Sequence, residues 1–169
     1  MNEDLSVSKE MFLDDVYRAQ RVFDSEDRWL DVGSHTGWFS RLAQTHGAAV
    51  VGGVDSDVEA IIRYGYLVPG VEVWNAHIES SNQLAKIIDK ANPTAVKIDI
   101  QGAEDFLEDG LHWTFGTSVN KILIEWHYPE KLVEILSVFE GDNYHISFAD
   151  RAVDILTGQT TYIIFATRR

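Results

Sequence analysis

Short apolar segments alternate with longer stretches of helical periodicity along this chain, and this alternation limits the possible folds more than any other feature. Strands that are buried on both faces of a parallel sheet are expected to be continuous apolar runs. Val50-Val51, Ile122–Ile124 and Ile163–Phe165 are runs of this type. Repeated strand–helix units place helices on both faces of such a sheet. The sequence therefore predicts an α/β fold, a doubly wound sandwich of three layers.

Periodicity, turn residues and capping residues indicate the individual elements. The predicted strands span residues 28–32, 49–54, 71–74, 95–100, 121–126, 144–148 and 161–166. The predicted helices span residues 9–23, 38–45, 57–66 with Ser56 as its N-cap, 82–91, and 129–141 opened by Pro129. Only a turn at residues 154–159 separates the last two strands, so they should be antiparallel. The expected sheet is seven-stranded and mostly parallel, with an antiparallel pair at its C-terminal end.

Length and composition bound the class of protein. A chain of 169 residues fits a single domain, 1–169, with residues 1–27 as an N-terminal helical extension. The chain has no cysteine, which excludes a disulfide framework, thiolate metal sites and a cysteine nucleophile. The net charge of −13 disfavours a nucleic-acid partner, because phosphate backbones are bound by Lys and Arg.

The N-terminal residues are acidic and polar, unlike a secretory signal, and no apolar run is long enough to span a bilayer. We therefore expect a cytoplasmic protein without a membrane partner. Exposed sheet edges would allow a homodimer.

Residues 31–37 contain the end of the first predicted strand and a glycine turn, which precedes the helix at 38–45. In an open α/β sheet, ligands bind beyond the carboxyl ends of the strands. We expect Gly33 to let a ligand approach the backbone and Gly37 to let the next helix pack closely. Free amides at the start of that helix would suit a carboxylate or a phosphate.

The residues of this turn discriminate between two cofactor classes. The dinucleotide fingerprint G-x-G-x-x-G, aligned with Gly33 as its second glycine, fails at Asp31 and Thr36. A carboxylate in the turn is unfavourable beside a pyrophosphate but suits the ammonium and sulfonium groups of S-adenosylmethionine. Asp55 ends the second strand, 24 residues after Asp31, where a carboxylate can accept both ribose hydroxyls. The pattern therefore favours S-adenosyl-L-methionine as the cofactor.

Three segments carry a resemblance to a known family. Asp31-Val-Gly-Ser-His-Thr-Gly37 resembles the first motif of class I S-adenosylmethionine-dependent methyltransferases. Residues 96–104, Val-Lys-Ile-Asp-Ile-Gln-Gly-Ala-Glu, resemble the fourth-strand motif of the FkbM methyltransferase family, and residues 122–127 resemble its fifth strand. The resemblance covers roughly residues 29–127. It implies a Rossmann-like enzyme that O-methylates a small-molecule or sugar hydroxyl. Gln101 departs from the motif, which has glutamate there.

The resemblance also implies a set of cofactor contacts. Residues 31–37 would surround the methionine part of the cofactor, Asp55 would hold the ribose, and residues 76–78 would flank the adenine. Asp99 would lie near the methionine amino group or the transferring methyl. The expected cofactor-binding residues are Asp31, Gly33, Ser34, His35, Gly37, Asp55, Ser56, Ala76, His77, Ile78 and Asp99.

Methyl transfer to a hydroxyl benefits from a general base with a pKa near neutrality, and histidine is suited to this role. His127 follows the fifth strand and should lie beside Asp99, so it is the first candidate. Glu104 and Glu125 are weaker ones, and Glu125 could instead fix His127 or a neighbouring backbone amide. Together these four side chains could also hold a hard metal ion, but no spacing demands one, and we predict none.

Three questions stay open from the sequence. Trp126 and Tyr128 could fill the core or line an acceptor pocket. Gln101 and the short chain are compatible with a module that binds the cofactor without catalysis. The third question is whether the chain is a nucleic-acid methyltransferase. Amino-methylating enzymes of that kind have Asn or Asp followed by Pro-Pro and an aromatic residue after the fourth strand, where this chain has Asp99-Ile-Gln-Gly102.

Overall fold

The computed structural model describes residue 9, residue 15 and the ranges 17–153 and 158–169. Its seven-stranded sheet has the order β3-β2-β1-β4-β5-β7-β6. The strands are β1 Arg28–Val32, β2 Ala49–Asp55, β3 Val73–Asn75, β4 Ala95–Ile98, β5 Lys121–Trp126, β6 Tyr144–Val153 and β7 Thr160–Arg168. Strands β1 to β5 are parallel, and β7 runs antiparallel to both β5 and β6. The predicted sheet, with its C-terminal antiparallel pair, is confirmed.

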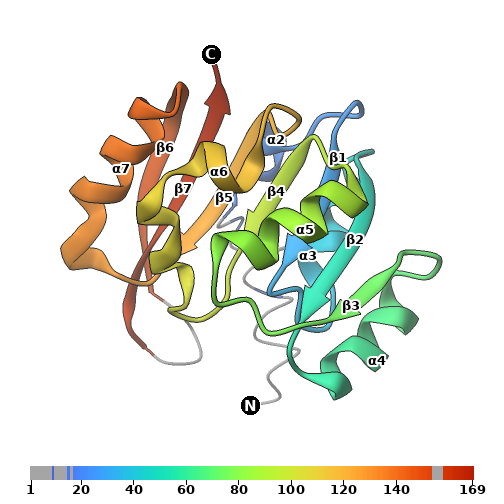
Figure 1. The fold of residues 1–169 in the computed structure, drawn as a ribbon. Coiled ribbons are helices and arrows are strands. Elements are labelled where there is room, and N and C mark those ends of the chain that lie inside the picture. The colour runs from blue at the N-terminus through green and yellow to red at the C-terminus, as the bar shows by residue number, and fades with distance from the viewer. Residues whose placement is uncertain (1–8, 10–14, 16, 154–157) are drawn as a thin grey trace.

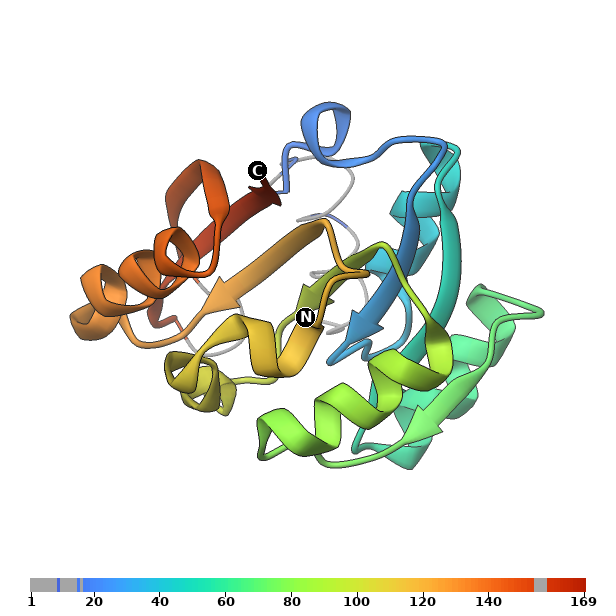
Figure 2. The same cartoon turned by 45° about the horizontal axis from the view of Figure 1, so that its top comes forward.

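Helices cover both faces of this sheet, which confirms the three layers (Figures 1 and 2). The helical segments are α2 Ala19–Val22, α3 Trp38–Thr45, α4 Val58–Leu67, α5 Ser81–Ala91, η1 Glu104–Asp109, α6 Leu111–Phe115, η2 Pro129–Lys131 and α7 Leu132–Gly141. Because neighbouring side chains of a strand point to opposite faces, β1 contributes to two cores. Leu30 packs in the core beneath α5, α6 and α7, whereas Trp29 packs with Phe39 of α3 and Val22 of α2. None of the helices among the described residues is both long and apolar enough to cross a membrane.

The predicted helix at 9–23 is not continuous: residue 9 and Ala19–Val22 are helical, whereas residues 15, 17 and 18 are not. Arg18 has a left-handed backbone with φ of 49°, and the helix that follows has only four residues. The Asp15 carboxylate accepts a hydrogen bond from the Ala19 amide at 2.7 Å, so a new helix is capped at this point. Asp15 also has a left-handed backbone with φ of 46°, and the Tyr17 side chain is buried against Phe39. Residues 10–14 and 16 lie outside the described part of the chain, as do residues 154–157 of the predicted turn.

Smaller differences lie at element ends. Strand β4 ends at Ile98, two residues earlier than predicted, and η1 and α6, which were not predicted, follow it. Asp57 rather than Ser56 caps α4, because its carboxylate accepts a hydrogen bond from the Glu59 amide at 2.8 Å. Pro129 opens the short η2 segment, and α7 starts only after it.

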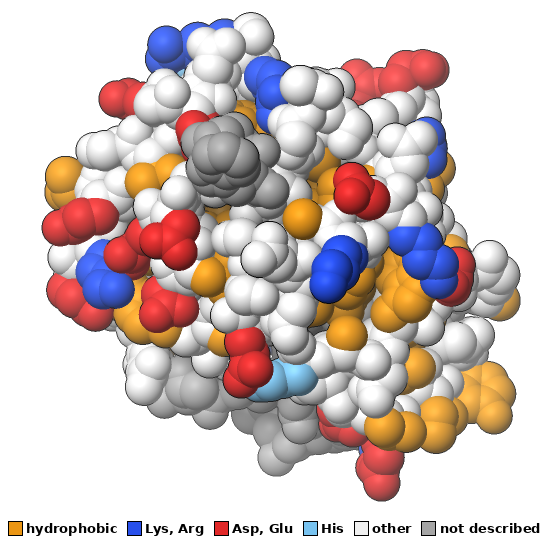
Figure 3. All heavy atoms as spheres, viewed as in Figure 1, with side chains coloured by type: hydrophobic (Ala, Val, Ile, Leu, Met, Phe, Trp, Pro, Cys, Tyr) orange, Lys and Arg blue, Asp and Glu red, His pale blue; other side chains and the backbone are white. Residues whose placement is uncertain are grey.

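Acidic side chains gather on the surface formed by η1, η2 and α7 (Figure 3). Asp105, Asp109, Glu130 and Glu134 are all exposed there. A phosphate backbone would be repelled from this face of the molecule.

Candidate functional site

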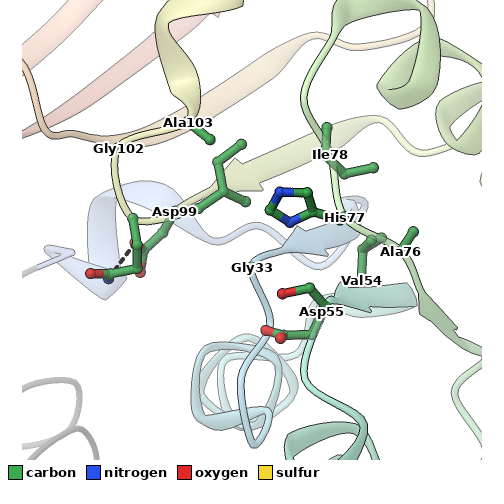
Figure 4. Close-up of a pocket in the computed structure, with 12 residues that line it drawn as sticks. Gly33, Val54, Asp55, Ala76, His77, Ile78, Asp99, Gly102 and Ala103 are labelled. Atoms are coloured by element: carbon green, nitrogen blue, oxygen red, sulfur yellow. Dashed lines mark hydrogen bonds between the residues drawn. The ribbon is translucent and has the colours of Figure 1, made fainter.

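A cleft of about 360 Å³ opens at the carboxyl ends of β1, β2 and β4. This is the edge of an open α/β sheet at which ligands bind. Of the residues expected to bind a cofactor, Gly33, Asp55, Ser56, Ala76, His77, Ile78 and Asp99 line it. The remaining lining residues are Val54, Ile100, Gln101, Gly102 and Ala103. In Figure 4, Asp55 and Asp99 lie on opposite sides of Gly33, and His77 and Ile78 project from the segment after β3.

Gly33 allows the turn after β1 to pack directly on the end of β4. Its φ of +72° is left-handed, and a Cβ built there would lie 1.6 Å from the carbonyl oxygen of Asp99. The Asp99 amide donates to the carbonyl of Val32 at 3.0 Å, which keeps the two segments together. The glycine is therefore required by this backbone contact, which forms the floor of the cleft.

Three backbone amides of the glycine turn already donate hydrogen bonds to acceptors within the protein. Those of Gly33 and Ser34 both donate to the carbonyl of Val54 at 2.9 Å. The amide of His35 donates to the Asp55 carboxylate at 2.7 Å. These three turn amides therefore have acceptors within the protein, whereas the free amides expected at the start of the helix stay a prediction. A phosphate is bound at such turns through amides that have no other acceptor, so the turn is poorly suited to a pyrophosphate.

Asp31 and Gly37 lie behind the wall of the cleft. Asp31 is fully buried and accepts a hydrogen bond from Ser40 of α3 at 2.7 Å. Tyr64 of α4 donates to the same serine at 2.8 Å. A Cβ on Gly37 would lie 2.7 Å from the Tyr64 ring, so the close packing predicted at Gly37 involves α4. This hydrogen-bonded chain joins β1, α3 and α4, and a direct contact of Asp31 or Gly37 with a cofactor stays a prediction.

Asp55 is half-buried and held by two backbone amides. Its Oδ2 accepts from His35 and its Oδ1 accepts from Asp57 at 2.8 Å. Each carboxylate oxygen has a second lone pair, so Asp55 can still accept hydrogen bonds from two hydroxyl groups. His35 itself, like Ser34, is not on the wall of the cleft.

Lys97 of β4 is a buried cation that contacts two residues of the cleft wall, Gly33 and Asp99. Its buried ammonium donates to the Gly33 carbonyl at 2.8 Å and lies 3.4 Å from both Asp31 Oδ1 and Asp99 Oδ2. Burial disfavours this charge, but the carboxylates of Asp99 and Asp31 outweigh burial and raise the pKa of Lys97. The Gln101 side chain donates to Asp99 Oδ1 at 3.2 Å. The Asp99 carboxylate is thus fixed from two sides.

The structure brings the predicted catalytic residues Asp99, Glu104 and His127 together. His127 Nδ1 lies 3.1 Å from Glu104 Oε1, and His127 Nε2 lies 4.0 Å from Asp99 Oδ1. Burial disfavours the imidazolium, but the hydrogen bond and charge of Glu104, followed by the charges of Asp99 and Glu125, raise the pKa of His127 to about 9. This value is above the near-neutral range predicted for a general base. The ring is therefore protonated at neutral pH.

Glu104 anchors the loop that follows β4. It is fully buried, and its Oε1 accepts from the amides of Ile100 at 2.9 Å and Gly102 at 3.3 Å, besides contacting His127. The same loop is held by Tyr128, whose hydroxyl donates to the Gly102 carbonyl. Trp126 is fully buried and belongs to the core, so only Tyr128 of the two aromatic residues approaches this loop. Glu104 therefore shapes the cleft from behind.

The same three side chains form the cluster in the described residues that could hold a metal ion, with ligand atoms within 4.8 Å of one another. Glu104 and Asp99, however, face opposite nitrogens of the His127 ring. The Lys97 ammonium also lies 3.4 Å from Asp99. The ammonium opposes a second cation at this place, and a site without a metal ion stays a prediction.

The charges on the cleft wall are those that suit a cationic ligand. Its ionisable side chains are Asp55, Asp99 and His77, and none of the lining residues is Lys or Arg. His77 is exposed and pairs with Glu79 at 3.2 Å. A ligand with a positive charge and vicinal hydroxyls matches these carboxylates, whereas a diphosphate would find no basic side chain on the wall.

Comparison with solved structures identifies the fold. The chain is similar to the ribosomal protein L11 methylase of Lactobacillus delbrueckii subsp. bulgaricus, with 13% identity, a TM-score of 0.63, and coverage of 89% of this chain and 75% of that chain. The magnesium protoporphyrin IX methyltransferase of Synechocystis PCC 6803, with bound S-adenosylmethionine, is 14% identical, with a TM-score of 0.65 and coverage of 100% and 85%. TrmK of M. capricolum, in complex with S-adenosylhomocysteine, is 13% identical, with a TM-score of 0.66 and coverage of 92% and 68%.

At these identities the likeness shows the fold alone, which is the Rossmann-like fold of these methyltransferases. No family model and no curated protein matches the sequence, so membership of the FkbM family is not confirmed.

Proposed function

We propose that this chain is an S-adenosylmethionine-dependent methyltransferase that O-methylates a small-molecule or sugar hydroxyl. The observation that carries the proposal is the cleft at the carboxyl edge of the sheet, which has Asp55 and Asp99 on its wall and no basic side chain. The fold is shared with structures that contain S-adenosylmethionine or its product S-adenosylhomocysteine. These cofactors carry a ribose diol and an ammonium group, for which the two carboxylates are suitable partners.

In this proposal, different residues of the cleft bind different parts of the cofactor. Asp55 accepts hydrogen bonds from the ribose hydroxyls, and Asp99 faces the cationic methionine end. The segment of Ala76, His77 and Ile78 flanks the adenine, where the buried Ile78 side chain provides an apolar surface. S-adenosylmethionine supplies an electrophilic methyl group, and the enzyme must chiefly align the acceptor with it.

The proposed hydroxyl acceptor lies beside Asp99 and His127. At neutral pH the protonated His127 holds no lone pair for the proton that the acceptor hydroxyl must lose, so the Asp99 carboxylate on the cleft wall would accept it. Above a pH of about 9 the ring is neutral, and Glu104 would orient it as a general base. The net charge of −13 and the acidic surface favour a small acceptor over a nucleic acid.

Calorimetric titration with S-adenosylmethionine, S-adenosylhomocysteine and NAD tests the cofactor. We expect binding of the first two and none of NAD. Asp55→Asn should weaken both through loss of one carboxylate oxygen, and Asp55→Ala should weaken them further because the turn amides also lose their acceptor. Asp89→Asn, which changes an exposed carboxylate of α5, is the matched control and should bind as the wild type does. Binding of NAD without S-adenosylmethionine would refute the proposal.

A single-turnover experiment with methyl-labelled S-adenosylmethionine and a panel of sugars and small alcohols distinguishes an enzyme from a module that only binds the cofactor. The second candidate is favoured by Gln101, which replaces a carboxylate of the resembling family and uses its amide on Asp99. Labelled product identifies an enzyme. Tight cofactor binding without product across the panel supports the non-catalytic module.

A further inference from the structure

We propose that Asp31 sets the preference of the cleft for a cationic over a neutral form of the cofactor, although it lies behind the wall. It does so by offsetting the charge of Lys97, which leaves the Asp99 carboxylate as the net charge that a ligand meets. This inference rests on the proposed function, because the two forms are S-adenosylmethionine and S-adenosylhomocysteine.

The geometry that carries this inference is a row of three charges that ends at the cleft. Asp31 and Lys97 occupy paired positions in the register of β1 and β4. The Lys97 ammonium lies 3.4 Å from a carboxylate oxygen of each aspartate. The side chains of Asp31 and Lys97 are 0% and 3% exposed, whereas that of Asp99 is 17% exposed and lines the cleft. Only Asp99 can therefore touch a ligand, and the other two charges act through it.

Two neighbours of Asp31, the Ser40 hydroxyl and the Lys97 ammonium, favour the ionised form of its carboxylate. Ser40 donates a hydrogen bond to its Oδ2 at 2.7 Å, and Tyr64 donates to Ser40 in turn. Burial raises the pKa of Asp31, and the Lys97 ammonium and the Ser40 hydrogen bond act against burial in favour of the ionised form. With Asp31 ionised, the row has one positive and two negative charges. Without that charge, Lys97 would neutralise Asp99.

The two forms of the cofactor provide a direct measure of this charge. S-adenosylmethionine carries a positive sulfonium, and S-adenosylhomocysteine has a neutral thioether at the same place, while their adenine, ribose and amino acid groups are identical. A change in the shape of the cleft alters the affinity of both. A change in its charge alters the ratio of their dissociation constants.

The test uses Asp31→Asn, which keeps the size of the side chain and an oxygen that accepts from Ser40. For one unit charge acting across about 10 Å at an effective dielectric constant of about 20, the preference for S-adenosylmethionine should fall roughly tenfold. The double variant Asp31→Asn/Lys97→Gln removes one charge of each sign and should return the ratio toward the wild-type value. Asp89→Asn on α5 is the control for loss of a solvent-screened carboxylate and should leave the ratio unchanged.

The outcomes separate this inference from the proposed function. If the wild type binds neither ligand, the proposed function fails first. If the wild type binds both and Asp31→Asn leaves the ratio unchanged, the inference is overturned while the function stands. If Asp31→Asn does not fold, Lys97→Gln provides the test, because it removes the positive charge of the same row. The ratio must then rise, and an unchanged or lower ratio overturns the inference.

Discussion

Replacement of Gly33 by alanine tests the backbone contact that forms the floor of the cleft. The added Cβ would lie 1.6 Å from the Asp99 carbonyl oxygen, and the φ of +72° is unfavourable for any residue with a side chain. The left-handed conformation costs roughly 1–2 kcal/mol, and forced overpacking adds about 1–3 kcal/mol. We therefore expect Gly33→Ala to lower the free energy of unfolding by about 2–5 kcal/mol.

Gly47→Ala provides a matched control for this experiment. Gly47 has a similar φ of +84°, but a Cβ there would have no atom within 4 Å. Its substitution should cost only the conformational strain of roughly 1–2 kcal/mol. Urea unfolding followed by circular dichroism measures both variants, and the difference between them isolates the steric contact.

Cofactor binding provides a second readout for Gly33→Ala. The Asp99 backbone has to move away from the added methyl group, so binding of S-adenosylmethionine should weaken in folded Gly33→Ala and remain unchanged in Gly47→Ala. If the two variants lose equal stability, the contact between Gly33 and Asp99 does not constrain the floor of the cleft. The reasoning about this turn would then be refuted.

Two further predictions concern His127 and the start of α4. Because the pKa of His127 is raised from 6.5 to about 9 in the folded protein, its stabilising effect is fully present below about pH 6.5 and is lost as the pH rises through about 9. The free energy of unfolding should therefore fall over this range in the wild type and much less in His127→Asn, and parallel curves in urea titrations would contradict the raised pKa. Asp57→Ala removes the N-cap of α4 and should lower the free energy of unfolding by about 1 kcal/mol, whereas Ser56→Ala should have little effect. Thermal unfolding of the two variants decides between these caps, and an equal loss would show that the Asp57 hydrogen bond to Glu59 is unimportant.

Two features of the cleft support the proposed preference for a cationic ligand. Its turn amides donate to Val54 and Asp55, and the Lys97 ammonium is paired behind the wall. Both features oppose a diphosphate and leave the two carboxylates of the wall as the main charges. The distinction from a dinucleotide site thus depends on what the backbone groups already contact, in addition to which residues are present.

Local sequence patterns determined the order of elements in this protein. The apolar runs of β5 and β7 are buried on both faces of the sheet, and such runs are visible in the sequence alone. The first strand and helix α3 were predicted at their observed bounds, with the glycine turn between them. Asp55 and Asp99 were expected at the carboxyl edge, since parallel strands end on the same side of a sheet. These features depend on neighbours in the chain, so the chain encodes them directly.

Contacts between distant residues decided what the sequence left open or led us to predict wrongly. The helix predicted through Arg18 is broken where Tyr17 is buried against Phe39, which no local pattern reveals. Other contacts between distant residues provide acceptors for the turn amides. They also raise the pKa of His127 through Glu104 and place the Lys97 ammonium between two carboxylates. Each of these effects depends on a distance of a few ångströms between separate strands and loops. Electrostatic and hydrogen-bond energies vary steeply over such distances, so the charge state of the site is a property of the tertiary structure.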